Sequence, residues 1–361
     1  MSPKIRRFLA GAGFGIVALV AAEIVARVDD WVRLGIPFTH TPDEDHDLKY
    51  RDWFGVRGRP FGRYRQWHLN NYGFRGPDIA RQAPAGCKRV MILGASESFG
   101  LYESEGQEYP AQLQDSLATR GCYQVVNAAI VGAGLQGIVR LWENYAAQFH
   151  PDIVVIYPSP AFYLGNAPPV WTPMPGKAAP DHDLPFRLRL IESFHNVWET
   201  PDFLQKRRLE KWLAQDTVGK STDWFFKGPP QDRLEAFGKD IDSLVKSVRA
   251  DGSEPVLMTH AMRFSIPPQA GDQMLLMGWR RFSPRARPEV MLEFEVAAAQ
   301  WMREYAAKEN VPLVDVDKQL SGRRELFGDF VHFTNAGSSI VAGVLARGLT
   351  SQRILAPGGA Q

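Results

Sequence analysis

The sequence has few of the features that mark specialised classes of protein. It has only two cysteines in 361 residues, and its formal net charge of +2 argues neither for a nucleic-acid partner nor for an acidic substrate. It contains no internal repeat and no low-complexity tract. Metal-ligand spacing is missing among six of its histidines, namely His40, His46, His68, His150, His182 and His195. We therefore predict no metal, no cofactor and no nucleic-acid partner.

A long hydrophobic run occurs at the N-terminus. Residues 8–26 carry a single charge, Glu23, and are near the roughly 20 residues that span a bilayer as a helix. Three basic residues precede the run: Lys4, Arg6 and Arg7. They predict a cytoplasmic N-terminus and a periplasmic or otherwise exported remainder, anchored by one helix. Residues 20–22 also resemble a cleavage site, so a cleaved signal peptide is the alternative. We favour the anchor, because apolar character persists to Arg27.

The rest of the chain has an ordinary globular composition, with 45% hydrophobic and 23% charged residues. Short, nearly continuous apolar runs predict strands at 89–93, 123–128, 153–157, 255–259 and 312–316. Helices are expected between and after them, at 109–119, 135–149, 233–250, 290–309 and 335–349. Such alternation favours an α/β fold with a parallel sheet covered by helices on both faces.

The pattern divides the chain into three parts. Residues 1–30 are the anchor or signal peptide, 31–86 form a lead-in segment with short strands packed on the main domain, and 87–355 form that domain. Residues 161–233 interrupt the alternation and are interpreted as an insertion, proline-rich at first and then helical. A long loop at 263–288 carries several arginines, which we expect to be solvated.

The two cysteines lie just before two predicted strands. Cys87 precedes the strand at 89–93, and Cys122 precedes the strand at 123–128. If those strands are parallel neighbours, both cysteines lie at one edge of the sheet, where a disulfide would suit an exported compartment. Two unpaired thiols fit the sequence equally well.

Two short segments carry the residues of an acyl-transfer site. Residues 94–100 (GASESFG) place Ser96 on a turn directly after a buried strand, where an open α/β sheet builds its binding crevice. Near the C-terminus, Asp329 and His332 lie three residues apart, after the last strand. Serine, histidine and aspartate supply a nucleophile, its base and a group that orients the base. Taken alone, Ser96 would be an ordinary helix N-cap. The 94–100 turn also lacks the Lys-Ser/Thr of a phosphate loop.

This layout resembles the SGNH, or GDSL-type, hydrolases between roughly residues 70 and 350. Residues 94–96 (GAS) match the block with the nucleophile, residues 127–132 (NAAIVG) match the second block, and Asp329 with His332 matches the last. The segment 72–76 (YGFRG) and the N-terminal anchor look like membrane-anchored bacterial members. The resemblance implies a three-layer α/β/α sandwich with a mostly parallel, five-stranded, flavodoxin-like sheet. It further implies an oxyanion hole made by the backbone N–H groups of Ser96 and Gly132.

The sequence departs from the family pattern at two places. Ala95 replaces the usual aspartate, which is not a member of the triad. The third block normally supplies an oxyanion asparagine, but residues 158–161 read PSPA, so Ser159 or Asn166 would have to substitute. Loss of one oxyanion donor typically costs about 10²–10³ in rate. His260, at the end of the strand 255–259, is expected to be structural or to line the substrate site.

The function expected from this resemblance is that of an exported, membrane-anchored serine esterase. It would hydrolyse acyl esters, acetyl esters among them, of cell-envelope glycans or lipids. One alternative is an O-acyltransferase that acts on an exported polysaccharide through the same triad. Another is a catalytically weak binding or scaffold protein of the envelope, which the altered third block motivates. The sequence determines neither the acyl group, nor the acceptor, nor the oligomeric state.

Overall fold

The strands that carry the motifs form one parallel sheet in the computed structural model, which describes residues 2–40, 43–52, 55–165, 188–189 and 202–355. The order across the sheet is β6-β5-β7-β8-β9. These strands are β5 (Lys88–Gly94), β6 (Tyr123–Asn127), β7 (Ile153–Tyr157), β8 (Glu254–Met258) and β9 (Leu313–Val314). Every neighbouring pair is parallel. In chain order this is 2-1-3-4-5, the flavodoxin-like arrangement, so the predicted fold class is confirmed.

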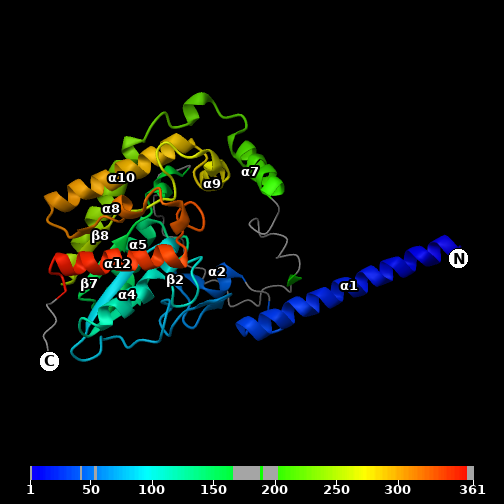
Figure 1. Ribbon diagram of the computed structural model, residues 1–361, viewed down its shortest axis with the longest axis horizontal. Coiled ribbons are helices and arrows are strands. Elements are labelled where there is room, and N and C mark those ends of the chain that lie inside the picture. Colours follow the sequence, from blue (N-terminus) through cyan, green and yellow to red (C-terminus); the bar gives the residue numbers. More distant parts are fainter. Residues whose placement is uncertain (1, 41–42, 53–54, 166–187, 190–201, 356–361) are drawn as a thin grey trace.

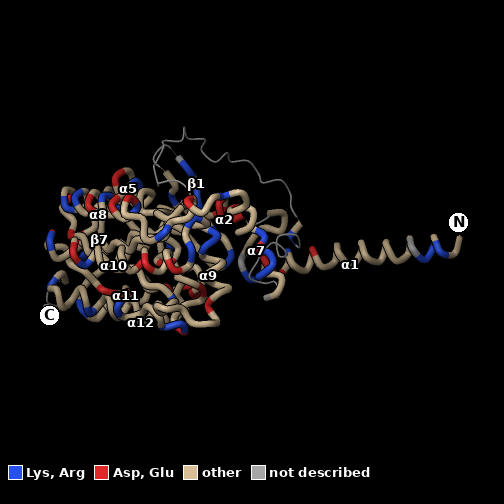
Figure 2. Tube along the Cα trace, turned by 90° about the horizontal axis from the view of Figure 1, so that it is seen from above, with Lys and Arg blue, Asp and Glu red and all other residues tan. Residues whose placement is uncertain are grey.

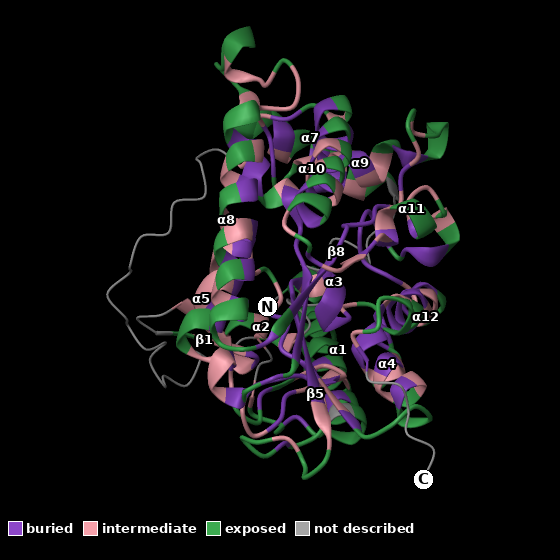
Figure 3. Cartoon of the chain, turned by 90° about the vertical axis from the view of Figure 1, so that its left-hand side faces the viewer, coloured by how far each residue is buried: buried purple, intermediate pink, exposed green. Residues whose placement is uncertain are grey.

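Helices cover both faces of the sheet, and alternate strand residues decide which face each layer meets (Figure 1). One face packs on α5 (Leu135–Asn144), α8 (Gln231–Ala250) and α10 (Pro288–Lys308). The other packs on α4 (Tyr109–Ala118) and α12 (Asn335–Ser351). Met91 and Leu93 of β5 belong to the first core, whereas Val90 and Ile92 belong to the second. Figure 3 shows the buried residues gathered along the strands and on the helix faces that meet them.

The predicted helices are confirmed with small changes at their ends, but several short helices were missed, of which the longest lies in the predicted loop at 263–288. The segment 263–288 contains α9 (Gln273–Arg280) and is not a plain loop. Its arginines are not simply solvated either, because Arg281 lies 4.0 Å from the ring centroid of Trp212 and Arg285 lies 4.4 Å from that of Phe226. Cation–π contacts hold these guanidinium groups against aromatic side chains of the insertion.

Short elements complete the chain. The lead-in contains α2 (Glu44–Asp47) and two antiparallel pairs, β1 (Lys49–Asp52) with β2 (Gly55–Gly58) and β3 (Arg63–Tyr64) with β4 (Trp67–His68). The insertion contains η2 (Pro160–Leu164), α7 (Asp202–Thr217) and η4 (Thr222–Trp224), whereas 166–187 and 190–201 lie outside the described residues. The remaining elements are α3 (Ser96–Phe99), η1 (Ala146–Phe149), η5 (Ala270–Asp272), α11 (Val316–Leu320) and η6 (Arg324–Leu326).

The N-terminal run forms α1 (Pro3–Leu34), which projects from the rest of the molecule (Figure 1). Within the described part of the chain it is the one helix long and apolar enough to cross a membrane, with a mean hydropathy of 2.2 and 6% of its apolar window buried. Basic residues lie at its free end (Figure 2). At its other end Arg27 pairs with Glu23 at 2.7 Å and donates to the carbonyls of Phe38 and His40. The base of α1 is thus bonded to the lead-in.

A disulfide joins Cys87 and Cys122, so the alternative of two unpaired thiols is wrong. The two residues directly precede β5 and β6, which pair from Lys88 and Tyr123 onward. The bond therefore fastens the starts of the two strands whose other ends carry the Ser96 turn and the Gly132 loop.

Candidate active site

Ser96 lies at the carboxyl end of the central strand β5 because of a close turn at Gly94. A Cβ atom on Gly94 would lie 2.2 Å from Ser98 Oγ, so only glycine lets the chain turn into α3 at this point. Ser96 is the first residue of α3. Its backbone N–H therefore belongs to the first-turn groups that have no partner inside the helix.

Ser96, His332 and Asp329 are joined by two hydrogen bonds in a line. Ser96 Oγ lies 2.7 Å from His332 Nε2, and His332 Nδ1 lies 2.7 Å from Asp329 Oδ2. The other carboxylate oxygen of Asp329 accepts the backbone N–H groups of Val331 and His332, each at 3.0 Å. The loop thus folds back on its own aspartate and presents the imidazole toward the serine, although 236 positions separate His332 from Ser96 in sequence.

The electrostatics of the line favour proton uptake by His332. Burial lowers the pKa of His332, but the charge and hydrogen bond of Asp329, with the charges of Glu97 and Glu103, outweigh burial and raise it. Burial raises the pKa of Asp329, but the charge of His332 and the backbone hydrogen bonds lower it overall. Asp329 is therefore an anion at neutral pH, and it can stabilise an imidazolium.

Aromatic rings surround His332 on two sides. The ring centroids of Tyr102 and Phe330 lie 5.6 Å and 6.0 Å from that of the imidazole. Phe330 is buried, whereas Tyr102 is 42% exposed and forms part of the outer surface. His332 itself is 8% exposed, so the base lies just beneath an aromatic rim.

The predicted oxyanion glycine lies in a tight turn of the second block. Gly132 has φ +76°, a left-handed conformation that favours glycine, and the N–H of Ala133 donates to the carbonyl of Ile130 across the turn. No heavy atom of the described structure lies within 4 Å of where a Cβ of Gly132 would be. Gly132 lines a cavity of about 530 Å³ together with Lys49 and Tyr50. Its role in an oxyanion hole stays a prediction.

The residues proposed to replace the third-block asparagine take other places. The hydroxyl of Ser159 donates to Glu97 Oε1 at 2.8 Å, so its proton is already engaged. Asn166 lies outside the described residues. His260 is 3% exposed and contacts two carboxylates instead of an open surface, so the geometry favours the structural role over a substrate-lining one.

Sequence reasoning missed the buried acidic partners of His260. Glu97 Oε1 lies 3.2 Å from His260 Nε2, and Glu295 Oε2 lies 2.8 Å from His260 Nδ1. Both glutamates are 3% exposed. The one signal available was a glutamate directly after Ser96, in a turn enclosed by apolar strands, because glutamate is almost never buried without a partner.

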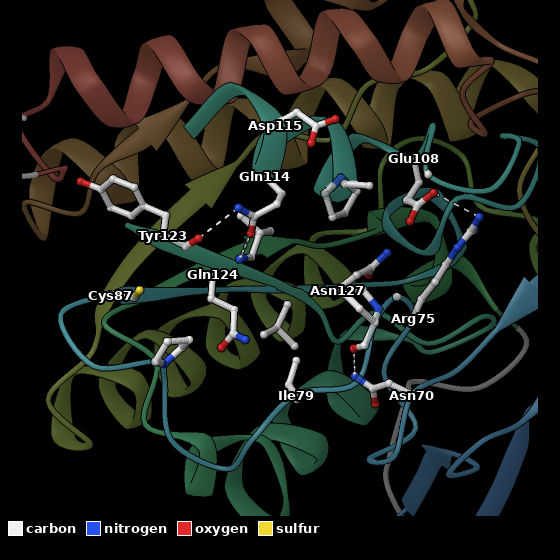
Figure 4. A pocket seen from close by; sticks show the side chains of 18 of the residues that line it. Asn70, Arg75, Ile79, Cys87, Glu108, Gln114, Asp115, Tyr123, Gln124 and Asn127 are labelled. Atoms are coloured by element: carbon white, nitrogen blue, oxygen red, sulfur yellow. Dashed lines mark hydrogen bonds and ion pairs between the residues drawn. The ribbon is translucent and has the colours of Figure 1, made fainter. Parts of the chain in front are cut away.

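A second cavity, of about 540 Å³, is lined by Cys87 and Cys122 of the disulfide and by Arg75 and Glu108 (Figure 4). The buried pair of Arg75 and Glu108, 3.2 Å apart, lies on its wall. Arg75 donates to the carbonyls of Phe99 and Gly100, and Asn127 donates to that of Ser98. These side chains satisfy the C-terminal carbonyls of α3 and so brace the short helix that begins with Ser96.

Within the described ranges, no group of three or more His, Cys, Asp or Glu side chains has an arrangement that could hold a metal ion. The buried acids and histidines described above are satisfied by each other, by hydroxyls and by backbone N–H groups.

No protein-family model matches the sequence, and no curated protein matches it. Among solved structures, the lipase/acylhydrolase from Enterococcus faecalis is similar, with a TM-score of 0.44 and 14% identity over 76% of this chain and 100% of that chain. A catalytic mutant of Axe2, an acetylxylan esterase from Geobacillus stearothermophilus, has a TM-score of 0.41 and 15% identity over 75% and 96%. A protein assigned to the lipolytic G-D-S-L family, from Desulfitobacterium hafniense, has a TM-score of 0.40 and 14% identity over 73% and 99%.

Similarities at this level say nothing about the substrate of this chain. The strand order and the side-chain geometry around Ser96 are independent of them. In that strand order and in its three sequence motifs the chain resembles the SGNH, or GDSL-type, hydrolases.

Proposed function

We propose that this protein is a serine esterase that cleaves acyl esters of the cell envelope. The observation that carries the proposal is the unbroken line from Ser96 Oγ through both nitrogens of His332 to Asp329, with 2.7 Å at each step. A serine alone is a poor nucleophile, and an imidazole at hydrogen-bond distance with an orienting carboxylate behind it removes that obstacle.

The reaction follows from the roles of the three side chains. His332 Nε2 takes the proton of Ser96 as Oγ forms a bond to the ester carbonyl carbon, and Asp329 holds the imidazole in the required tautomer. The backbone N–H groups of Ser96 and Gly132 donate to the oxyanion. The bond to the leaving oxygen then breaks, and that oxygen receives the proton from His332. Water, activated in turn by His332, releases the acid and restores the serine.

We also propose that α1 holds the enzyme at the outer face of a membrane. The helix is exposed along its apolar length and has basic residues at its free end. It continues unbroken through Ala22, and Arg27 beyond it bonds to the lead-in, which supports an uncleaved anchor. The disulfide fits an oxidising compartment. N-terminal sequencing of protein from a membrane fraction tests this part, and a terminus near residue 23 would contradict it.

Reaction of the full-length protein in detergent with a fluorophosphonate probe tests the esterase proposal. We expect covalent labelling on Ser96, read by peptide mass spectrometry, and its loss in Ser96→Ala and His332→Ala. Ser104→Ala, which removes an exposed serine nearby, is the matched control and should label normally. A folded protein that does not label contradicts the proposal and favours a binding role in the envelope.

Acyl transfer is a second candidate, favoured by the aromatic rim of Tyr102 and Phe330 beside His332. Apolar rings near the base limit the access of water, and an acceptor hydroxyl could then resolve the acyl-enzyme in its place. Product analysis with and without a glycan acceptor separates the two reactions. Acylated glycan in place of free acid would show transfer.

A further inference from the structure

We propose that Glu97 is a positioning residue for the serine–histidine pair: its buried carboxylate, held from behind by His260 and Ser159, stabilises the imidazolium that His332 becomes when it takes the proton of Ser96. This inference rests on the proposed function for its catalytic meaning. The coupling between Glu97 and His332 can nevertheless be measured without any turnover.

The two oxygens of Glu97 have different partners. Oε1 accepts the hydroxyl of Ser159 at 2.8 Å and lies 3.2 Å from His260 Nε2. Oε2 lies 3.4 Å from Ser96 Oγ. One oxygen therefore fixes the carboxylate in place, and the other faces the atom that gives up its proton.

The ring of His260 is held as a cation. Carboxylate oxygens face both of its nitrogens, Glu97 at Nε2 and Glu295 at Nδ1, and only an imidazolium donates from both. Burial lowers the pKa of His260, but the charges and hydrogen bonds of the two glutamates outweigh burial and raise it. Glu295 is itself fixed by the backbone N–H of Ala161 at 3.1 Å.

The network keeps a negative charge next to the active serine. The carboxylates of Glu97 and Glu295 together with the imidazolium of His260 give the network a net charge of about −1. Burial raises the pKa of Glu97, but His260 and the charge of His332 lower it overall, so the carboxylate stays ionised. An unpaired carboxylate here would oppose an oxyanion. The cation of His260 offsets that cost while leaving a field that favours protonated His332.

The groups that face His332 come from three elements. Asp329 is on its own loop, Glu97 on α3, and Glu103 with Tyr102 on the segment that follows α3. Burial and the nearby Asp329 raise the pKa of Tyr102, so this phenol is neutral. Removing the charge of Glu97 therefore leaves Asp329 as the anion bonded to His332. Glu103 is a further acidic group beside it, and burial raises the pKa of Glu103 to about 7.

Glu97 and Ser159 are hydrogen-bonded to each other. Ser159 lies where the family pattern has its oxyanion asparagine. The hydroxyl of Ser159 thus holds the carboxylate of Glu97 in place, and Glu97 in turn acts on His332.

An NMR titration of His332 tests the proposal in full-length protein that carries Ser96→Ala and is therefore inactive. Adding Glu97→Gln should lower the pKa of His332 by about 1 unit. Glu105→Gln, which removes an exposed carboxylate a few residues away, is the matched control and should shift it far less. An unchanged titration of His332 in a folded Glu97→Gln protein overturns the proposal.

The kinetic readout uses Glu97→Gln with the active serine. We expect a lower kcat with little change in KM, and an acid limb of the rate profile moved to lower pH by about 1 unit. Should the glutamine variant fail to fold, Glu97→Asp keeps the charge but withdraws it from Ser96, and a smaller shift in the same direction is expected. An unchanged pKa of His332 in a folded Glu97→Asp protein also overturns the proposal. If the titration shifts but the wild type never labels with fluorophosphonate, the coupling stands and the esterase function fails.

Discussion

Two buried histidines in this molecule are each bound by carboxylates, yet they differ in what they can do with a proton. His332 has Asp329 on Nδ1 and the hydroxyl of Ser96 on Nε2. His260 has a carboxylate on each nitrogen, from Glu295 and Glu97. A ring between two anions keeps its proton, whereas a ring between an anion and a hydroxyl can gain and lose one. The difference lies at Nε2: a hydroxyl there leaves His332 able to act as a base, whereas a carboxylate there keeps His260 a cation.

The position of each ring in the fold agrees with this difference. His332 lies on a loop next to Tyr102, a residue that is 42% exposed. His260 lies two residues past the end of β8, is 3% exposed and packs against the ring of Tyr157. The base is near solvent and the cation is in the core. A buried ion network is costly to disrupt, which is why the two rings should respond differently to substitution.

Removing the base is expected to have the largest effect. His332→Ala should lower kcat/KM by about 10⁶, as loss of a single member of such a unit costs nearly as much as loss of all of them. Stability should also fall, because Asp329 is buried and keeps only the backbone N–H groups of Val331 and His332 as donors, so circular dichroism on the same sample has to show a folded protein. Steady-state hydrolysis of a short-chain aryl ester measures the effect. Activity within tenfold of the wild type would show that His332 is not the base.

The carboxylate behind the base comes next. Asp329→Asn keeps the shape but lets Nδ1 accept a hydrogen bond in place of donating one, which selects the wrong tautomer. We expect kcat to fall by about 10⁴ with the fold intact. Circular dichroism on the same samples confirms folding. A loss of less than tenfold would mean that Asp329 does not orient His332.

Removing the fixed cation should act on stability first. His260→Gln leaves Glu97 and Glu295 without their buried partner, and breaking such a network costs about 3–5 kcal/mol in the free energy of unfolding. Urea denaturation measures it. His68→Gln is the matched control, because His68 pairs with Glu105 at a surface where such pairs contribute about 0–1 kcal/mol. Equal costs for the two variants would refute the contrast between them.

The disulfide should contribute to the free energy of unfolding by an amount similar to, or slightly smaller than, the loss expected for His260→Gln. Replacing Cys87 and Cys122 with alanine opens a link across 35 residues and should lower the free energy of unfolding by about 2–4 kcal/mol. The reduced wild-type protein should show the same loss. An unchanged midpoint of unfolding would indicate that the bond does not form in the protein as isolated.

The effect confined to the narrowest conditions, a single pH window, concerns Glu103, beside the active loop. Burial, only partly offset by hydrogen bonds from Ser338 and the backbone, raises its pKa from 4.5 to about 7. The folded state therefore holds this proton more tightly, so its contribution to stability falls as pH rises from about 4.5 to about 7 and is constant above that. Glu103→Gln should flatten the melting temperature across this window. If the melting temperatures of Glu103→Gln and the wild type changed with pH in parallel, Glu103 would not be the group with the raised pKa.

Much of the site could be predicted because it depends on strand ends. Parallel strands end at one edge of a sheet, so a serine after β5 and a histidine after β9 are expected at the same edge. The strands β7 and β8 lie between β5 and β9, and the segment between η6 and α12 brings His332 back to Ser96. The helix α9 and the cation–π contacts of Arg281 and Arg285 could not be predicted in this way. Eight residues give a weak periodic signal, and the aromatic partners come from a different part of the chain.

The sequence by itself determined the alternation of strands and helices, the turn that carries Ser96, the three-residue spacing of Asp329 and His332, and the apolar N-terminal helix, because each depends on local pattern or on short spacing. The strand order was implied only by the family resemblance, because it depends on pairing between distant segments. Only the tertiary structure decided the pairing of the cysteines and the environment of Glu97. His260 reaches Glu97 across 163 positions and Ser159 reaches it across 62. A carboxylate can be buried only where donors satisfy it, and a local sequence pattern does not identify donors that come from distant segments.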